Sequence, residues 1–342
     1  MQRFSAAAVV LLCVGLLSAA SKDLRIYFVD VEGGGATLIV TPTGESLLVD
    51  TGNPGNDDRD AKRIYAAAQD AGLTKITYLL ITHFDGDHVG GAPALAKMIP
   101  IGKFLDHGDS IQAGTPQGAR LWEGYLSVAA GKRTSMRVAD RVPLKGLQVE
   151  AVSSNGQVLA GPINGGRSNE ALCKDAQQKD PDKTENALSL GFLLTFGKFK
   201  FLDLGDLTWE KEIELACPVN KLGRVTLYQA THHGFFGDRS GAPPHLFAIQ
   251  PQVVIVNNGP SKGLTTPALY ERITKIPGIE GIWQGHLTLA NDAQHNTAPD
   301  MIANLGSTPE CKGYWLKVTV EHNGKFTVMN GRNGFSKSYL AR

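Results

Sequence analysis

The chain has 342 residues, of which 42% are hydrophobic and 20% are charged, and its formal net charge is +1 at pH 7. This composition is typical of an ordinary globular protein and argues against a disordered chain. A balanced charge also gives no support to a protein that binds nucleic acid chiefly by neutralising phosphates, because such proteins carry a basic excess.

The first twenty residues differ from the rest of the chain. Arg3 precedes a short apolar run over 6–17, and small residues follow at 18–20. This pattern predicts a secretory signal peptide over 1–20 and one folded domain over 21–342. The apolar run is shorter than the roughly 18 residues that a membrane span needs, so we expect no membrane association after cleavage. The protein is therefore expected to be exported, to the periplasm or out of the cell.

Three cysteines lie beyond that segment: Cys173, Cys217 and Cys311. In an oxidising compartment they allow one disulfide and one remaining thiol, and three pairings are open. None has the C-x-x-C spacing of a zinc site, so we expect one structural bridge and a buried thiol.

The first half of the chain contains short apolar, β-branched runs separated by turn residues. The runs 24–31, 37–40 and 47–49 predict three successive strands. Apolar residues at helical spacing over 58–71 predict a helix, which leads into a continuous apolar run over 76–81. That run predicts a buried strand.

The second half follows the same plan. The expected elements are a hairpin over 187–196 and 199–204, a helix over 209–216, strands over 225–230 and 253–257, a helix over 267–275, a strand over 279–283 and a terminal hairpin over 314–329. The segment 153–183 is rich in Gly, Asn, Asp and Lys and predicts a long loop that covers a site or is mobile. Both halves place polar residues where strands end.

A His-x-Asp-x-Asp-His motif follows the strand that ends at Ile81. It consists of His83, Asp85, Asp87 and His88. Alternate residues of an extended turn point the same way, so the first three can converge, and His88 can join them if a helix begins there. Four potential ligands directly after a buried strand are more specific than the His and Asp of a solvated loop, and they predict a metal site.

Two further clusters also follow apolar strands. Asp206 ends the first, and the pair His232 and His233 ends the second. Two divalent ions about 3.5 to 4 Å apart need a shared anionic bridge with His or carboxylate groups on either side. Together with the first motif, these residues predict a two-metal centre.

On these residues the sequence resembles the metallo-β-lactamase superfamily, and within it the hydrolase domain of ComEC-type DNA-uptake channels and the phosphorylcholine esterases. Those domains carry the same variant motif that His83 to His88 form here. The similarity runs over nearly the whole chain after residue 20, including segments 28–31, 48–52, 204–206 and 231–234. It implies an α/β fold, an αββα sandwich of two mixed sheets flanked by helices.

The resemblance also implies a set of ligands. One ion would be held by His83 and Asp85, the other by Asp87 and His88, with Asp206 as the bridge and one of His232 and His233, preferably His232, completing the second site. The superfamily usually has another histidine between the first motif and the bridging Asp, and this chain has Asn186 at the matching place. The first ion then has Asn186 as a weak ligand or no protein ligand there. Glu32 and Phe235 also depart from the ComEC-type pattern, which puts the substrate contacts of those segments in doubt.

The expected mechanism uses the ions to activate water. A pair of ions can lower the pKa of a shared water so that hydroxide is available at pH 7. Asp87 can orient that water or shuttle its proton, and His233 or His286 can protonate a leaving group or hold a phosphate. A hydrogen-bonded structural role is an equal alternative for His286. Asp85 in place of a histidine makes the first site harder, which favours zinc and tolerates manganese or iron.

These features predict an exported two-metal hydrolase that acts on phosphoesters, as a phosphodiesterase, phosphatase or nuclease-like enzyme. A lactam, lactone or thioester hydrolase is the alternative enzyme, because the same centre serves those substrates. A catalytically silent, metal-bearing binding protein is an alternative from another class, which the departure at Asn186 favours. We expect a small-molecule or phosphoester substrate as partner, and the oligomeric state is open.

Overall fold

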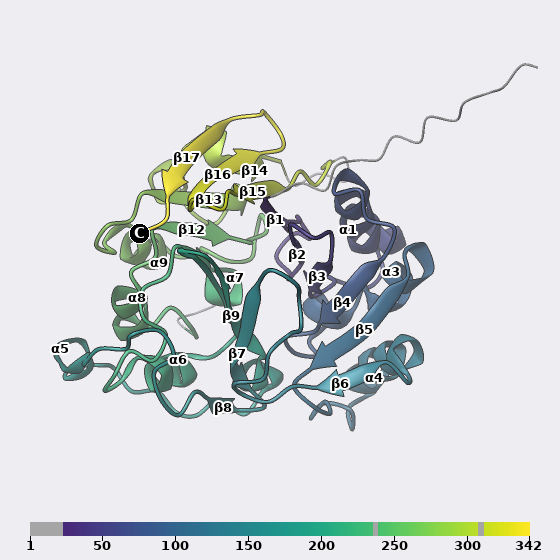
Figure 1. Ribbon diagram of the computed structural model, residues 1–342, viewed down its shortest axis with the longest axis horizontal. Helices are drawn as coiled ribbons and strands as arrows, with labels where there is room; N and C mark the ends of the chain where they lie inside the picture. Colours follow the sequence, from purple (N-terminus) through teal and green to yellow (C-terminus); the bar gives the residue numbers. More distant parts are fainter. Residues whose placement is uncertain (1–22, 235–238, 307–310) are drawn as a thin grey trace, which may run out of the picture.

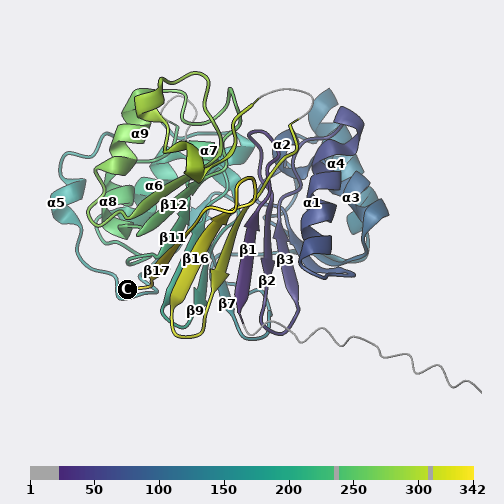
Figure 2. The same ribbon diagram turned by 90° about the horizontal axis from the view of Figure 1, so that it is seen from above.

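The computed structural model describes residues 23–234, 239–306 and 311–342. The predicted signal peptide over 1–20 lies outside these residues. Two mixed β-sheets lie face to face, and helices cover the outer face of each sheet (Figures 1 and 2). This arrangement confirms the predicted αββα sandwich.

The first sheet combines the N-terminal strands with the C-terminal ones. Its nine strands are, in spatial order, β17 (Ser336–Leu340), β16 (Lys325–Asn330), β15 (Leu316–Val320), β1 (Leu24–Phe28), β2 (Thr37–Val40), β3 (Ser46–Val49), β4 (Ile76–Leu80), β5 (Ile101–Asp106) and β6 (Arg133–Ser135). Strands β3, β4, β5 and β6 are parallel to one another, and β3 is antiparallel to β2. Strands β2 and β3 are buried throughout, as expected for short apolar runs covered on both faces.

The second sheet holds the middle of the chain. Its eight strands are β14 (Ile302–Asn304), β13 (Gly281–His286), β12 (Val253–Val256), β11 (Leu227–Gln229), β10 (Phe199–Asp203), β9 (Gly191–Phe196), β7 (Gln148–Ser154) and β8 (Gln157–Val158). Strands β10 to β14 are parallel, which places their carboxyl ends at one edge of the sheet.

Three apolar layers hold the sandwich together. A central layer between the sheets contains Phe201, Trp283 and Phe326. One outer layer joins the first sheet to α1 (Arg59–Asp70), α3 (Ala92–Met98) and α4 (Pro116–Ala129), and the other joins the second sheet to α6 (Trp209–Ala216), α8 (Pro243–Ile249) and α9 (Pro267–Thr274) (Figure 2). Short α-helical segments are α2 (Gly86–Val89), α5 (Glu170–Cys173) and α7 (Thr231–Gly234), and 3₁₀ turns span Asn56–Asp58, Glu185–Leu188, Ala293–His295 and Pro299–Met301. Within the described ranges, no helix has the length and apolar character that crossing a bilayer requires.

Strand β2 and helix α6 have the predicted bounds, and the other predicted elements differ in detail. The strand expected from residue 187 begins only at Gly191, because Glu185–Leu188 form a 3₁₀ turn. The expected loop 153–183 contains β8 and α5, and the terminal hairpin gains a third strand, β17. Elements α3, β5, α4, β6 and most of β7 lie in a region for which the sequence analysis predicted no structure.

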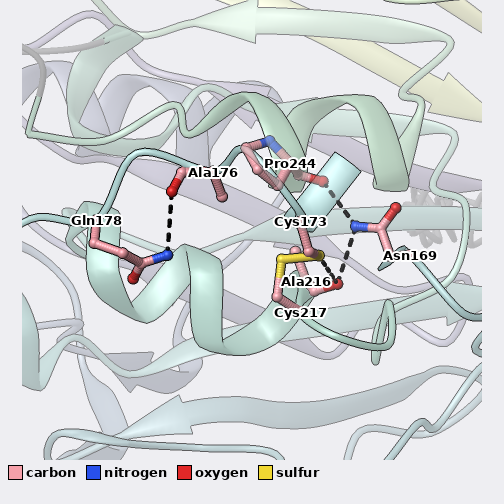
Figure 3. Close-up of a disulfide and its surroundings, with 7 residues drawn as sticks. All are labelled: Asn169, Cys173, Ala176, Gln178, Ala216, Cys217 and Pro244. Carbon is pink, nitrogen blue, oxygen red and sulfur yellow. Dashed lines mark hydrogen bonds between the residues drawn. A yellow bond between two sulfur atoms is a disulfide. The ribbon is translucent and has the colours of Figure 1, made fainter. Parts of the chain in front are cut away.

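A disulfide joins Cys173 to Cys217, at the ends of α5 and α6 (Figure 3). Asn169 lies beside it and donates from Nδ2 to the carbonyl oxygens of Ala216 at 3.0 Å and Pro244 at 3.3 Å, which ties α5 to α6 and α8. The bridge selects one of the three possible pairings and leaves Cys311 as a half-buried thiol.

Replacing both cysteines of the bridge by alanine should destabilise the protein. The bridge spans a sequence separation of 44 residues, and releasing a loop of that size corresponds to about 4 kcal/mol of chain entropy in the unfolded state. Urea denaturation of Cys173→Ala/Cys217→Ala should therefore show a lower midpoint than Cys311→Ala, which keeps the bridge. Equal midpoints would contradict a stabilising bridge.

Candidate metal centre

The predicted ligands lie where the carboxyl ends of parallel strands from both sheets meet. His83 follows β4 in the first sheet, Asp206 follows β10 in the second, and His232 and His233 follow β11. Ligand sites in α/β sheets form outside the carboxyl ends of strands. Here the two sheets present these ends to each other, because His83 Nε2 lies 3.9 Å from Asp206 Oδ2.

The backbone of the first motif takes the conformation that convergence requires. Asp85 is extended and precedes α2, which begins at Gly86 and carries His88. A side chain at Gly91 would place its Cβ 2.1 Å from the carbonyl oxygen of Thr51, so only glycine allows this close approach. The helix that the sequence analysis expected begins at Gly86, and it places His88 near the other residues of the motif.

The histidine pair after β11 adopts a strained backbone. His232 and His233 have φ values of 56° and 59°, so α7 is not a regular helix. Left-handed conformations of non-glycine residues cost of order 1 to 3 kcal/mol each and occur mostly at functional sites. In this conformation both imidazoles reach Asp206.

Asp206 is the centre of the cluster. Its Oδ2 lies 3.4 Å from His232 Nε2 and 3.3 Å from His233 Nε2, and its Oδ1 lies 3.4 Å from His88 Nε2. His83 approaches the same carboxylate from the first sheet. A buried carboxylate among four imidazoles has the position that a bridging ligand needs.

A four-residue group suits the second ion. Asp87, His88, Asp206 and His233 offer ligand atoms that all lie within 4.8 Å of one another. His233 Nε2 is 3.4 Å from Asp87 Oδ2 and 3.2 Å from His88 Nε2. The geometry thus puts His233 in this group, whereas the sequence analysis preferred His232, which also contacts Asp206 but is not among these four residues.

The remaining predicted ligands lie around the first position. His83 Nε2 is 3.6 Å from Asp85 Oδ2, and His83 is fully buried. Asn186 lies in the 3₁₀ turn whose Glu185 accepts a hydrogen bond from the Phe84 backbone, next to His83. His83 Nε2 and Asn186 Oδ1 are buried and form no hydrogen bond with any described residue. Such buried donor atoms fit a metal ion as their partner.

The charges of the cluster also suit cations. Burial raises the pKa of Asp206, but the histidines, with His232 foremost, outweigh it and hold that pKa well below its usual value. Burial likewise lowers the pKa of His88, yet the charges of Asp206, Asp50 and Asp87 raise it well above its usual value. A divalent ion can take the place of the proton that these carboxylates stabilise on His88.

Neighbouring polar side chains hold the predicted ligands in position, and the sequence analysis did not predict these contacts. Asp50 Oδ2 lies 2.7 Å from His88 Nδ1, and the Asp50 carboxylate accepts hydrogen bonds from Thr82 N and Oγ1. Gln112 Nε2 donates to Asp85 Oδ1 at 2.9 Å, and Lys262 Nζ contacts Asp87 Oδ2. Two features of the sequence pointed to Asp50: it directly follows a buried strand, and it lies in segment 48–52, which carries part of the family resemblance.

His286 lies in a different group. Its Nε2 is 2.8 Å from Asp30 Oδ1, and it belongs to a cluster with Glu32 and Cys311. Its expected role at the leaving group therefore has no contact to support it in the described part of the chain.

Parts of the sequence are similar to known proteins. Residues 30–157 match the sequence model of the Metallo-beta-lactamase superfamily. Recombination protein 2 of Haemophilus influenzae is 24% identical over 256 residues, which cover 73% of this chain and 26% of that protein. A UPF0173 metal-dependent hydrolase of Cupriavidus metallidurans is 42% identical over 74 residues, 20% of this chain and 23% of that protein. The chain thus spans about a quarter of the length of these relatives.

Solved structures show more distant similarity. A putative metal-dependent hydrolase from Parabacteroides distasonis has a TM-score of 0.44 and 15% identity, covering 76% of this chain and 92% of that one. The metallo-beta-lactamase fold protein YhfI from Bacillus subtilis has a TM-score of 0.47 and 10% identity, and the match covers 76% of this chain and 95% of that protein.

Asp50→Asn should weaken metal binding. An amide cannot accept all the hydrogen bonds that the Asp50 carboxylate receives from Thr82 and His88, and loss of such outer partners typically costs about 10- to 100-fold in metal affinity. Competition with a chelator would measure the change. The control is Asp60→Asn, a buried carboxylate that pairs with Arg59. Unchanged affinity in Asp50→Asn would refute its role in orienting His88.

Proposed function

We propose that this chain, a metal-dependent hydrolase with a metallo-beta-lactamase superfamily domain, uses two divalent ions to hydrolyse phosphoesters. The observation that carries the proposal is the position of Asp206, whose carboxylate lies between ligands from both sheets. A single tetrahedral ion needs about four ligands, and the donors around Asp206 exceed that number. The arrangement therefore favours two ions that share Asp206.

The ligands divide between two positions. His83 and Asp85 would hold one ion with Asn186 as a weak additional donor, and Asp87, His88 and His233 would hold the other, with Asp206 common to both. Bound divalent ions supply a nucleophile from water at neutral pH and stabilise the charge that develops on the attacked group. Zinc suits this mixture of nitrogen and oxygen donors, and manganese or iron is tolerated because Asp85 and Asp87 are hard ligands.

The other side chains would position the substrate and the attacking water. His232 contacts the Asp206 carboxylate and is not part of the four-residue group, and burial lowers its pKa to about 4, so its neutral imidazole can hydrogen-bond to the substrate. Asp87 is placed to orient the attacking water, because Lys262 and His233 hold its Oδ2. His233 thus takes the ligand place that the sequence analysis favoured for His232.

Phosphoester substrates are favoured by charge. Two ions that clamp the attacking and leaving oxygens suit an in-line displacement at phosphorus. Lys262 adds a third cation at the edge of the centre, where it can pair with a phosphate oxygen. The name of the Haemophilus relative, Recombination protein 2, makes DNA one phosphodiester to test.

A substrate panel tests the proposal. The protein should hydrolyse a phosphodiester, a phosphomonoester or single-stranded DNA, should lose this activity with a chelator and should regain it with zinc. Hydrolysis of a lactone or lactam alone would overturn the choice of phosphoesters. Metal binding without turnover of any substrate would favour a metal-bearing binding protein.

Asp206→Asn should impair both ion positions together, because a bridging carboxylate neutralises part of the charge of both ions. Metal content should fall, and the phosphodiesterase rate should fall at least about 100-fold, since each 1.36 kcal/mol of lost transition-state stabilisation costs a factor of ten. Metal analysis and rate measurements would check this result.

The matched control is Asp203→Asn, on the same run of chain. Burial raises the pKa of Asp203 to about 7, and its Oδ1 accepts a hydrogen bond from Gly205 N. An amide therefore resembles its protonated form, and the variant should keep its metal. Normal metal content in both variants, or greater damage from Asp203→Asn, would refute the bridge.

Export is the second part of the proposal. The small residues at 18–20 after an apolar run support cleavage after residue 20. Mass spectrometry of protein recovered from the periplasm or medium should show a chain that begins at Ser21. An intact Met1 on such material would contradict the inference.

A further inference from the structure

A second cluster of potential ligands lies apart from the Asp206 centre. It contains Asp30, two residues after β1, Glu32, His286 at the end of β13, and Cys311 before β15. The ligand atoms of these four residues all lie within 4.8 Å of one another. A carboxylate pair, an imidazole and a thiol in one place form a donor set that zinc accepts.

His286 is the residue that indicates a ligand. It is fully buried, and neither ring nitrogen forms a hydrogen bond with any described residue. Its Nε2 lies 2.8 Å from Asp30 Oδ1, although the ring is not aligned for a hydrogen bond to that oxygen. Both atoms can reach one zinc ion, because zinc bonds to nitrogen and oxygen are about 2.0 to 2.2 Å long and twice that length exceeds the separation of the two atoms.

Two arginines hold the carboxylates from outside. Arg63 donates to Asp30 Oδ2 at 2.8 Å and to Glu32 Oε1 at 3.1 Å, and Arg59 pairs with Glu32 Oε2 at 2.6 Å. Arg63 also donates to the Cys311 carbonyl oxygen at 2.7 Å, which fixes the cysteine in the cluster. Metal-binding carboxylates are usually held by such outer hydrogen bonds.

A plain ion-pair network explains only part of this cluster. The arginines satisfy Asp30 Oδ2 and both oxygens of Glu32. They provide no partner for His286, whose burial without a hydrogen bond is costly. Within the described part of the chain, the Cys311 thiol has only a long contact of 3.6 Å, as donor to Asn304 Oδ1.

We propose that Asp30, His286 and Cys311, with Glu32 as the fourth donor, bind one zinc ion. Binding would release the Cys311 thiol proton to solvent as the thiolate forms. Two carboxylates and a thiolate would then face two guanidinium groups and the ion, so the site would carry one net positive charge. Asp30 follows a strand of the first sheet and His286 ends a strand of the second, so the ion would join the sheets, and a site filled by four protein ligands is closed, as structural zinc sites are.

Cobalt substitution separates this site from the Asp206 centre, which contains no cysteine. The full chain loaded with Co²⁺ should show a thiolate-to-cobalt charge-transfer absorption. Cys311→Ser and His286→Asn should each lose this band and bind one ion fewer per chain than the unmodified protein. Asp206→Asn should keep the band while losing ions from the other centre.

Loading the chain that begins at Ser21 leaves Cys311 as the one thiol outside the disulfide, so the band reports Cys311. The proposal is overturned if the cobalt protein shows no thiolate band. It is also overturned if Cys311→Ser keeps the band and the same metal content, or if His286→Asn keeps both. None of these outcomes depends on the substrate or on the phosphoesterase proposal.

Discussion

The rest of the structure depends on one constraint: the Asp206 carboxylate, which follows a strand of the second sheet, must meet His83 and His88, which follow a strand of the first. Burying a carboxylate is costly unless charges and hydrogen bonds compensate for it. The two sheets are therefore aligned so that imidazoles surround Asp206. The central apolar layer, which includes Phe201 and Trp283, packs the two sheets against each other in that alignment.

Buried polar residues outside the Asp206 cluster hold the proposed ligands in place. Glu185 is fully buried, and its carboxylate lies 3.0 Å from His107 Nε2 and accepts hydrogen bonds from Ser110 Oγ and Phe84 N. Burial raises the pKa of Glu185, but His107 and Ser110 outweigh it and lower the pKa, so the carboxylate is ionised. It thereby fixes the Phe84 backbone between the first two ligands of the motif, as Asp50 fixes His88 on the other side.

The two ligand clusters lie in similar positions between the sheets but contain different donor atoms. Both lie after strands of both sheets, so each can join the halves of the sandwich. The Asp206 cluster consists of histidines and carboxylates, the donor types found in hydrolytic metal centres. The Asp30 cluster contains a thiol and two arginine-held carboxylates, a set better suited to a closed structural site.

The resemblance to a known superfamily implied the αββα class, and the sequence by itself determined elements such as β2 and α6 and the motif from His83 to His88. These follow from local pattern, because residue spacing decides which side chains share a face. Only the tertiary structure decided that His233 rather than His232 joins Asp87, and that Asp50 and Glu185 support the ligands. It also decided that Cys173 pairs with Cys217 and that His286 faces Asp30. Each of these is a contact between residues distant in the chain or a choice made by backbone angles, and both depend on how the two sheets meet rather than on any local pattern.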